Sequence, residues 1–175
     1  MRFVDFLRTT VLLSAGAATA LATLTVFAAA GAHNVLVAAS IGWWIVASAI
    51  GLRAGRRAQT NPPIARLLAS ASASKTLPEH RPGAIMLNRL WPLLLFTLIA
   101  GGSAFFAPQV PGIAAGFAII WALSWRRQDA AVEAIEERDG ASFYVQRTSP
   151  IRPMSLLRTP GFAASRPERV NGAVT

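Results

Sequence analysis

Four long runs without a charged side chain divide this sequence, and they constrain the fold more than any other feature. They cover residues 9–30, 35–52, 90–106 and 110–125, which are 22, 18, 17 and 16 residues long. About 20 apolar residues, rising about 1.5 Å each, cross the roughly 30 Å hydrocarbon core of a bilayer. The runs therefore predict four transmembrane helices, of which the last two are short and suit little tilt or a thinned bilayer.

The composition agrees with a membrane chain and excludes several kinds of site. Only 14% of the residues are charged and 53% are hydrophobic, whereas soluble proteins have roughly 25% charged residues. The absence of cysteine excludes disulfides, thiolate catalysis and cysteine-based zinc sites. His33 and His80 are the only histidines. We therefore expect no metal site and no cofactor.

The basic residues predict the orientation of the chain. Lys and Arg precede the first run, fill the loop between the second and third runs, and follow the fourth run, whereas the short connections 31–34 and 107–109 contain none. Because positively charged segments stay in the cytoplasm, we expect both termini and the central loop to be cytoplasmic, in a bacterial inner membrane. The sequence also offers aromatic anchors for the membrane interface: Trp43, Trp44, Trp91, Trp121 and Trp125.

The expected fold is an all-α integral membrane protein with four transmembrane helices in two antiparallel hairpins. Its parts are a first hairpin (1–53), a basic cytoplasmic loop with an interfacial helix (54–83), a second hairpin (84–125), a cytoplasmic helix with a strand-like tail (126–162) and a disordered terminus (163–175). Two alternatives stay open. Segment 9–32 could be a cleaved signal peptide, since 30–32 fits an A-x-A site. Segment 90–125 could be a re-entrant hairpin, because both of its ends are basic.

The central loop contains a short helix signal. Asn61 can cap a helix that has Pro62 in its first turn, and Ile64, Leu67 and Leu68 then fall on one face. This pattern predicts an interfacial helix over 61–71. Basic residues flank this helix and the apolar runs, where we expect them to contact lipid headgroups or a partner: Arg53, Arg56, Arg57, Arg66, Arg89, Arg126 and Arg127.

Small residues within the runs predict close helix packing. Gly112 and Gly116 form a G-x-x-x-G pair in the fourth run, and Gly101 and Gly102 lie in the third. Glycine allows two helix backbones to approach each other closely in a membrane. The pattern does not separate packing within one chain from packing between chains.

The segment after the fourth run predicts a helix over 126–138 followed by a short strand. Phe143 and Val145 belong to the strand, and Gly140 ends the helix. One face of the helix is acidic: Asp129, Glu133, Glu136 and Glu137. We expect this face to dock onto Arg53, Arg56 and Arg57, and the strand to fold back against 151–157 or onto the loop helix. A partner protein that accepts the strand is the alternative.

No run contains an ionisable residue, and no catalytic motif is present, so no residue is assigned a catalytic role. The hydroxyl side chains in the runs are expected to bond to backbone carbonyls or neighbouring helices. The leading functional hypothesis is a non-catalytic anchor, assembly or accessory component of a membrane complex. The alternatives are a small oligomeric transporter or channel and, least favoured, a lipid-modifying enzyme. The expected partners are the bilayer, anionic headgroups, and a second copy or another membrane protein, but not nucleic acid.

Overall fold

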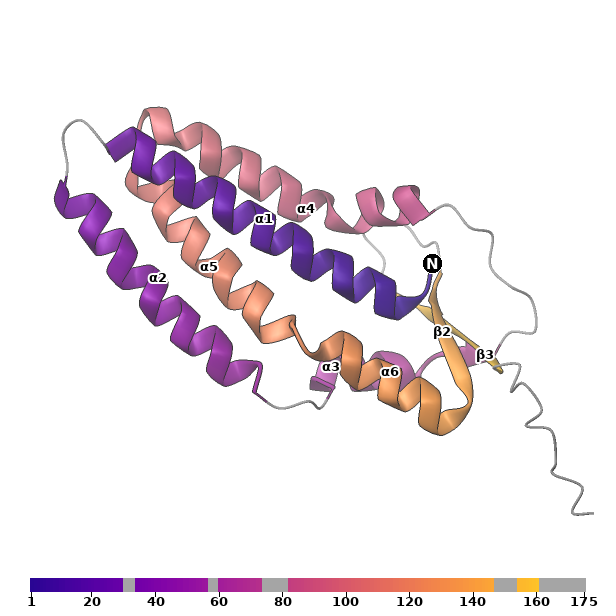
Figure 1. The fold of residues 1–175 in the computed structure, drawn as a ribbon. Helices are drawn as coiled ribbons and strands as arrows, with labels where there is room; N and C mark the ends of the chain where they lie inside the picture. The colour runs from indigo at the N-terminus through magenta and orange to yellow at the C-terminus, as the bar shows by residue number, and fades with distance from the viewer. Residues whose placement is uncertain (30–33, 57–59, 74–81, 147–153, 161–175) are drawn as a thin grey trace, which may run out of the picture.

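The chain is mostly helical in the computed structural model, which describes residues 1–29, 34–56, 60–73, 82–146 and 154–160. Its long helices run side by side (Figure 1): α1 (Phe3–Ala29), α2 (Asn34–Ala54), α4 (Pro82–Gly102) and α5 (Gln109–Trp125). The shorter elements are α3 (Pro62–Ala69), the 3-10 turn η1 (Ser103–Phe105), α6 (Gln128–Asp139), β1 (Ser72–Ala73), β2 (Ala141–Val145) and β3 (Leu156–Pro160). The segment predicted to be disordered, 163–175, lies outside the described residues, as does the candidate cleavage site.

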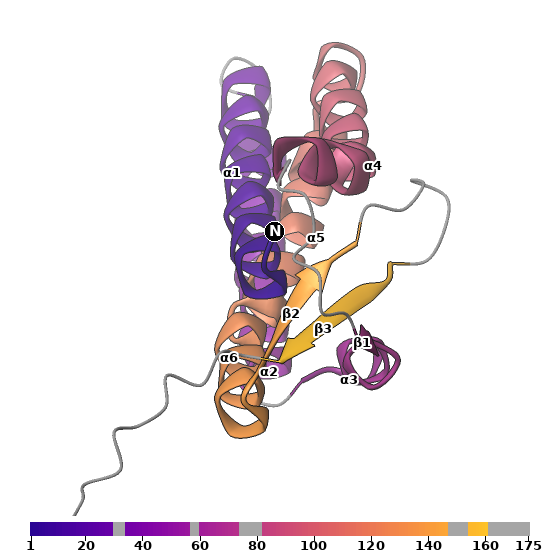
Figure 2. The ribbon, with the colours of Figure 1, turned by 90° about the vertical axis from the view of Figure 1, so that its right-hand side faces the viewer.

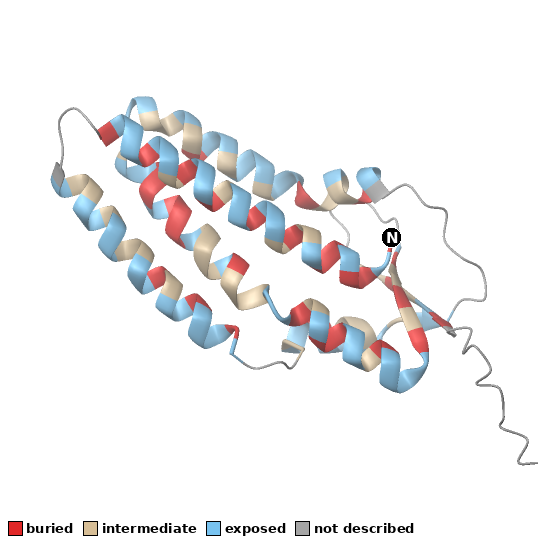
Figure 3. Ribbon diagram, viewed as in Figure 1, coloured by how far each residue is buried: buried red, intermediate tan, exposed pale blue. Residues whose placement is uncertain are grey.

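Three of the described helices are long and apolar enough to cross a membrane: Phe3–Ala29, Val35–Ala54 and Gly83–Phe105. Much of their surface is exposed (Figure 3), and it includes large apolar side chains such as Phe27, Val35 and Leu98. An apolar surface of this extent is unfavourable in water and suits lipid. These helices indicate a membrane protein. The fourth apolar run also forms a helix, α5, with 17 residues.

The packing of the long helices does not follow the predicted hairpins. α5 packs mainly against α1 and α2, while α1 and α2 make little direct contact with each other. Figure 1 shows α5 between them. The reason is that α5 has small residues on its inner face, since Gly112, Ala115 and Gly116 are all buried. A helix with such a face can lie close to two neighbours at once.

The short elements form a small cap at one end of the long helices, which we define as α3, α6 and the three strands. β3 is the central strand: it pairs antiparallel with β2, with Phe143 opposite Arg158, and parallel with β1. Figure 2 shows α6 beside β2 and α3 beside β1. Residues at the start of the chain extend the sheet, because the Val145 N–H donates a hydrogen bond to the Met1 carbonyl.

The predicted elements of the cap are present with shifted bounds. α3 begins at Pro62 as expected, and Asn61 precedes it in an extended conformation. The helix predicted over 126–138 is not continuous with the preceding one, because α5 ends at Trp125 and α6 begins at Gln128. Gly140 ends α6 with a φ of 58°, which suits glycine because other side chains are strained there. The strand pairs within the chain, with 156–160, which overlaps the predicted partner 151–157 at Leu156 and Leu157.

Two separate apolar cores hold the structure together. The larger core lies where the cap meets the long helices, and it takes buried side chains from α1, α3, α4, α6, β2 and β3: Phe3, Leu7, Ile64, Ile85, Val132, Phe143, Val145 and Leu156 among them. The smaller core lies among the long helices and consists of Leu21, Ala100, Ala114 and Ala115. Each fully buried large apolar side chain stabilises the fold by about 1.5–3 kcal/mol. The larger core therefore fixes the cap to the helices.

Candidate functional site

The contact between α2 and α5 is the tightest described packing feature, and the predicted glycine pair lies in it. A Cβ atom added at Gly112 would lie 2.7 Å from Ser40 Oγ and 3.1 Å from Thr25 Cγ2. A Cβ atom at Gly116 would overlap the indole of Trp43. A side chain at Gly116 would displace the Trp43 ring, and one at Gly112 would displace the Ser40 hydroxyl, so both glycines pack against helices of the same chain. We call this contact the α2–α5 seam.

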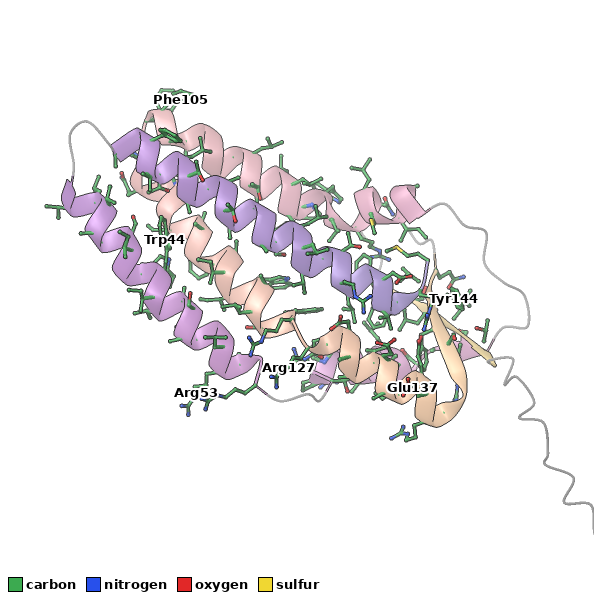
Figure 4. All side chains as sticks on the ribbon, in the orientation of Figure 1. Trp44, Arg53, Phe105, Arg127, Glu137 and Tyr144 are labelled. Carbon is green, nitrogen blue, oxygen red and sulfur yellow. The ribbon has the colours of Figure 1, made fainter. Side chains whose placement is uncertain are left out.

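Two tryptophans of α2 hydrogen-bond across this seam. Trp43 Nε1 donates to the carbonyl of Ile113 at 3.1 Å, and Trp44 Nε1 donates to the carbonyl of Gly112 at 2.9 Å. Figure 4 shows Trp44 extending from α2 toward α5. Both tryptophans are half-buried, and an indole N–H that is removed from water usually finds a hydrogen-bond partner. Carbonyls are accessible here because glycine leaves the α5 backbone uncovered. Local sequence patterns did not predict this pairing.

A second glycine pair contributes to the same seam and was missed from the sequence. A Cβ atom at Gly51 would lie 2.8 Å from Leu123 Cβ, and one at Gly55 would overlap the Leu123 carbonyl. These residues also have G-x-x-x-G spacing, which is the signal that could have identified them. Because Ser40 lies near Gly112 and Gly55 near Leu123, α2 and α5 run in the same direction.

The two glycines predicted in the third run differ in their surroundings. A Cβ atom at Gly101 would meet Leu24 Cδ1 of α1 at 3.3 Å, so Gly101 lies against a neighbouring helix. A Cβ atom at Gly102 would have nothing within 4 Å. Gly102 therefore does not take part in helix packing among the described residues.

Hydroxyl side chains in the long helices bond to their own backbone. Thr10, Ser14 and Thr25 are buried, and each donates to the carbonyl four residues earlier at 2.8 Å. Such bonds satisfy a hydroxyl without a second helix. The described residues include no buried side-chain polar atom that lacks a hydrogen-bond partner.

The acidic face of α6 docks onto α1 rather than onto Arg53 and Arg56. Glu136 Oε2 accepts a 2.6 Å ion-paired hydrogen bond from Arg2, and Asp129 pairs with Arg8 at 3.3 Å. The prediction was wrong about the partner because the chain turns between α5 and α6 and brings α6 alongside the start of α1. The other predicted partner, Arg57, lies outside the described residues.

Glu136 is the central polar residue of the cap. Its side chain is only 5% exposed, and its second oxygen accepts a 2.8 Å hydrogen bond from the backbone N–H of Phe143. This carboxylate therefore ties β2 and Arg2, the residue just before α1, to α6. The hydrogen bond and the charge of Glu136 raise the pKa of the Arg2 guanidinium above its usual value.

The remaining predicted tail residues divide into a buried and an exposed group. Phe143 and Val145 are buried in the larger core. Glu133 and Glu137 are exposed on α6 and form no ion pair with any described residue. The tail is thus held to the rest of the fold by the apolar strand residues Phe143 and Val145 and by two of the four predicted acidic residues, Asp129 and Glu136.

A groove lies at the cap end of α2, and basic residues line it. Its apolar lining comes from Ile50, Ala54 and Pro62, and its polar lining comes from Arg53, Arg56, Thr60 and Asn61. We call it the basic groove. Figure 4 shows Arg53 at the end of α2 and Arg127 at the nearby start of α6. Two of the predicted headgroup-binding arginines therefore line one site.

The α5–α6 junction fixes the walls of the basic groove. Arg127 NH1 donates to the backbone carbonyl of Arg56 at 3.0 Å. The backbone N–H of Asn61 donates to Gln128 Oε1 at 3.0 Å, and the Gln128 side chain is buried. The end of α2 and the start of α3 are therefore both attached to the same short segment.

The other predicted headgroup contacts lie apart from this lining. Arg66 and Arg126 are exposed, and Arg89 is half-buried and already engaged in an interaction. Within the described ranges, no group of three or more metal-ligating side chains comes together.

Comparison of the chain with protein-family models, with curated proteins and with solved structures finds no match. The function is therefore inferred from the residues of this chain alone.

Proposed function

We propose that this chain is a non-catalytic component of a bacterial inner-membrane complex that anchors a small cytoplasmic cap to the bilayer. In this proposal α1, α2, α4 and α5 each cross the membrane, and the cap, both termini and the central loop lie in the cytoplasm. The observation that carries the proposal is the larger core, because it joins the cap to the long helices through α1, α3, α4, α6, β2 and β3. Such a construction presents a rigid surface at the membrane.

The α2–α5 seam supports the proposed fourth crossing. α5 has 17 residues, which span roughly 25 Å at about 1.5 Å per residue. It runs parallel to α2 from the level of Ser40 to the level of Gly55. Since α2 is long and apolar enough to span the bilayer, a helix beside it over this length reaches nearly the same depths.

The polar contacts support a structural role. The Glu136 carboxylate binds Arg2 and the Phe143 N–H, and Gln128 binds the Asn61 N–H. These buried groups hold elements of the fold together. The exposed Glu133 and Glu137 on α6 then offer the cap an acidic surface for a basic region of a partner protein.

In-cell photo-crosslinking tests this role at the protein's own expression level. A photoreactive residue replaces Glu133 on the cap in one variant and Leu98, an exposed residue of α4, in the other. We expect the cap variant to give one discrete protein adduct. If the cap position gives no protein adduct while the chain is correctly inserted, the proposed assembly role is wrong.

A further inference from the structure

We propose that the basic groove is a binding site for the phosphate of an anionic glycerophospholipid. The inference rests on the proposed membrane crossing and on the position of the cap at the bilayer surface, but not on the assembly role. Among the described residues, two guanidinium groups line the groove, those of Arg53 and Arg56. Neither forms an ion pair with an acid among the described residues. Guanidinium groups bind phosphate through short charge-assisted hydrogen bonds.

The groove also offers neutral donors. Thr60 contributes a hydroxyl, and Asn61 contributes a side-chain amide. The Asn61 side chain does not cap α3, although the residue occupies the N-cap position, so its amide remains available to a ligand. Two cations with neighbouring neutral donors match one phosphodiester and the hydroxyls of a glycerol headgroup.

The position of the groove favours a lipid over a free anion. Arg53 and Ala54 are the last residues of α2 and the last residues of its candidate membrane span, Val35–Ala54. Charged residues at the end of a transmembrane helix lie at headgroup depth. Ile50 is both a wall of the groove and an exposed apolar residue of α2. The groove therefore opens onto the surface that contacts acyl chains.

An acyl chain has a continuous path above the groove. Val46, Ile50 and Arg53 follow one another at i, i+4 and i+7, which places them on one face of α2. Val46 is 50% exposed and Ile50 is 46% exposed. A phospholipid with its phosphate at Arg53 can lay one acyl chain along these two side chains, whereas inorganic phosphate gains nothing from them.

The walls of the groove are fixed before any ligand binds. Arg127 holds the carbonyl of Arg56, and Gln128 holds the N–H of Asn61. Gly55 is packed under the Leu123 carbonyl. Because these contacts already order the backbone, binding a headgroup loses little further backbone freedom.

Native mass spectrometry of the full-length protein in detergent tests this site. The probes are phosphatidylglycerol, phosphatidylethanolamine and inorganic phosphate. We expect one tightly retained phosphatidylglycerol, and the double variant R53Q/R56Q is expected to lower its affinity about tenfold or more, as the loss of charge-assisted bonds implies. The matched control is R138Q/R158Q, which removes the same charge from exposed cap residues outside the groove and is expected to leave binding unchanged.

Two further arms separate the lipid from other anions. Ile50→Ser is expected to weaken phosphatidylglycerol binding severalfold while leaving any phosphate binding unchanged. Equal losses in R53Q/R56Q and R138Q/R158Q would show general charge attraction and overturn the site. Competition by inorganic phosphate at a similar concentration would show a free-phosphate site and overturn the assignment to lipid. If the double variant does not fold, Arg53→Gln alone serves, and crosslinking from the cap reports separately on the assembly role.

Discussion

Replacing Gly116 with alanine tests the α2–α5 seam most directly. The added Cβ would overlap the indole of Trp43, so the ring must move and give up its 3.1 Å hydrogen bond to the Ile113 carbonyl. Overpacking of this kind costs about 1–3 kcal/mol, and the lost hydrogen bond about 0.5–1.5 kcal/mol. Alanine favours a helix over glycine by about 0.5–1 kcal/mol, which offsets part of this cost. We therefore expect Gly116→Ala to lower the free energy of unfolding by about 1–3 kcal/mol.

The matched control is Gly42→Ala on α2. Gly42 is the residue before Trp43, and a Cβ atom there would meet nothing within 4 Å. Alanine favours a helix over glycine by about 0.5–1 kcal/mol, so this variant is expected to be neutral or slightly more stable. The same chemical change, one methyl group, is thereby expected to have opposite effects at two glycines.

Reversible unfolding in mixed detergent micelles measures both variants. A double-mutant cycle with Trp43→Ala identifies the cause, because the cost of Gly116→Ala is expected to fall below about 1 kcal/mol once the indole is removed. Equal stabilities of Gly116→Ala and Gly42→Ala would refute the reasoning. So would an unchanged cost of Gly116→Ala in the Trp43→Ala background.

Three further predictions concern the cap and the orientation of the chain. Glu136→Gln removes the charge that pairs with Arg2 and is expected to cost about 1–3 kcal/mol, whereas the exposed Glu133→Gln stays within about 0.5 kcal/mol; equal melting temperatures would contradict this. Amides of β2 are expected to exchange slowly in the purified protein, and rapid exchange that slows only with an added partner would show that the strand needs that partner. Reporter fusions after residues 33, 70, 108 and 140 are expected to indicate outside, inside, outside and inside. An outside signal at residue 70 would overturn the orientation.

Local patterns in the sequence were sufficient for most of the secondary structure. Uncharged runs predict helices because their length and polarity are properties of consecutive residues. Asn61 and Pro62 mark the start of α3, and Gly140 marks the end of α6, because capping depends on residues next to each other in the chain. The break between α5 and α6 could not be predicted, since Arg126 and Arg127 carry no helix-breaking signal.

Part of the candidate site could also be predicted locally. Basic residues at the end of the second run predict headgroup depth, and the structure places two of them, Arg53 and Arg56, in the lining of one groove. The groove itself could not be predicted, because its walls at Arg56 and Asn61 are held by hydrogen bonds to Arg127 and Gln128, about 70 positions away in the sequence. Hydrogen bonds across such distances leave no periodic trace in the sequence.

The sequence by itself determined that this chain has four apolar helices, a short loop helix and a strand-forming tail, because hydropathy, charge and capping act over a few residues. Only the tertiary structure decided which surfaces meet. It placed α5 between α1 and α2, directed the indoles of Trp43 and Trp44 to carbonyls of α5, and paired Glu136 with Arg2 rather than with the central loop. The physical reason is that packing depends on complementary shapes of distant segments. The glycines of α5 allow any helix of complementary shape to pack there, and Glu136 pairs with the cation that the fold places beside it.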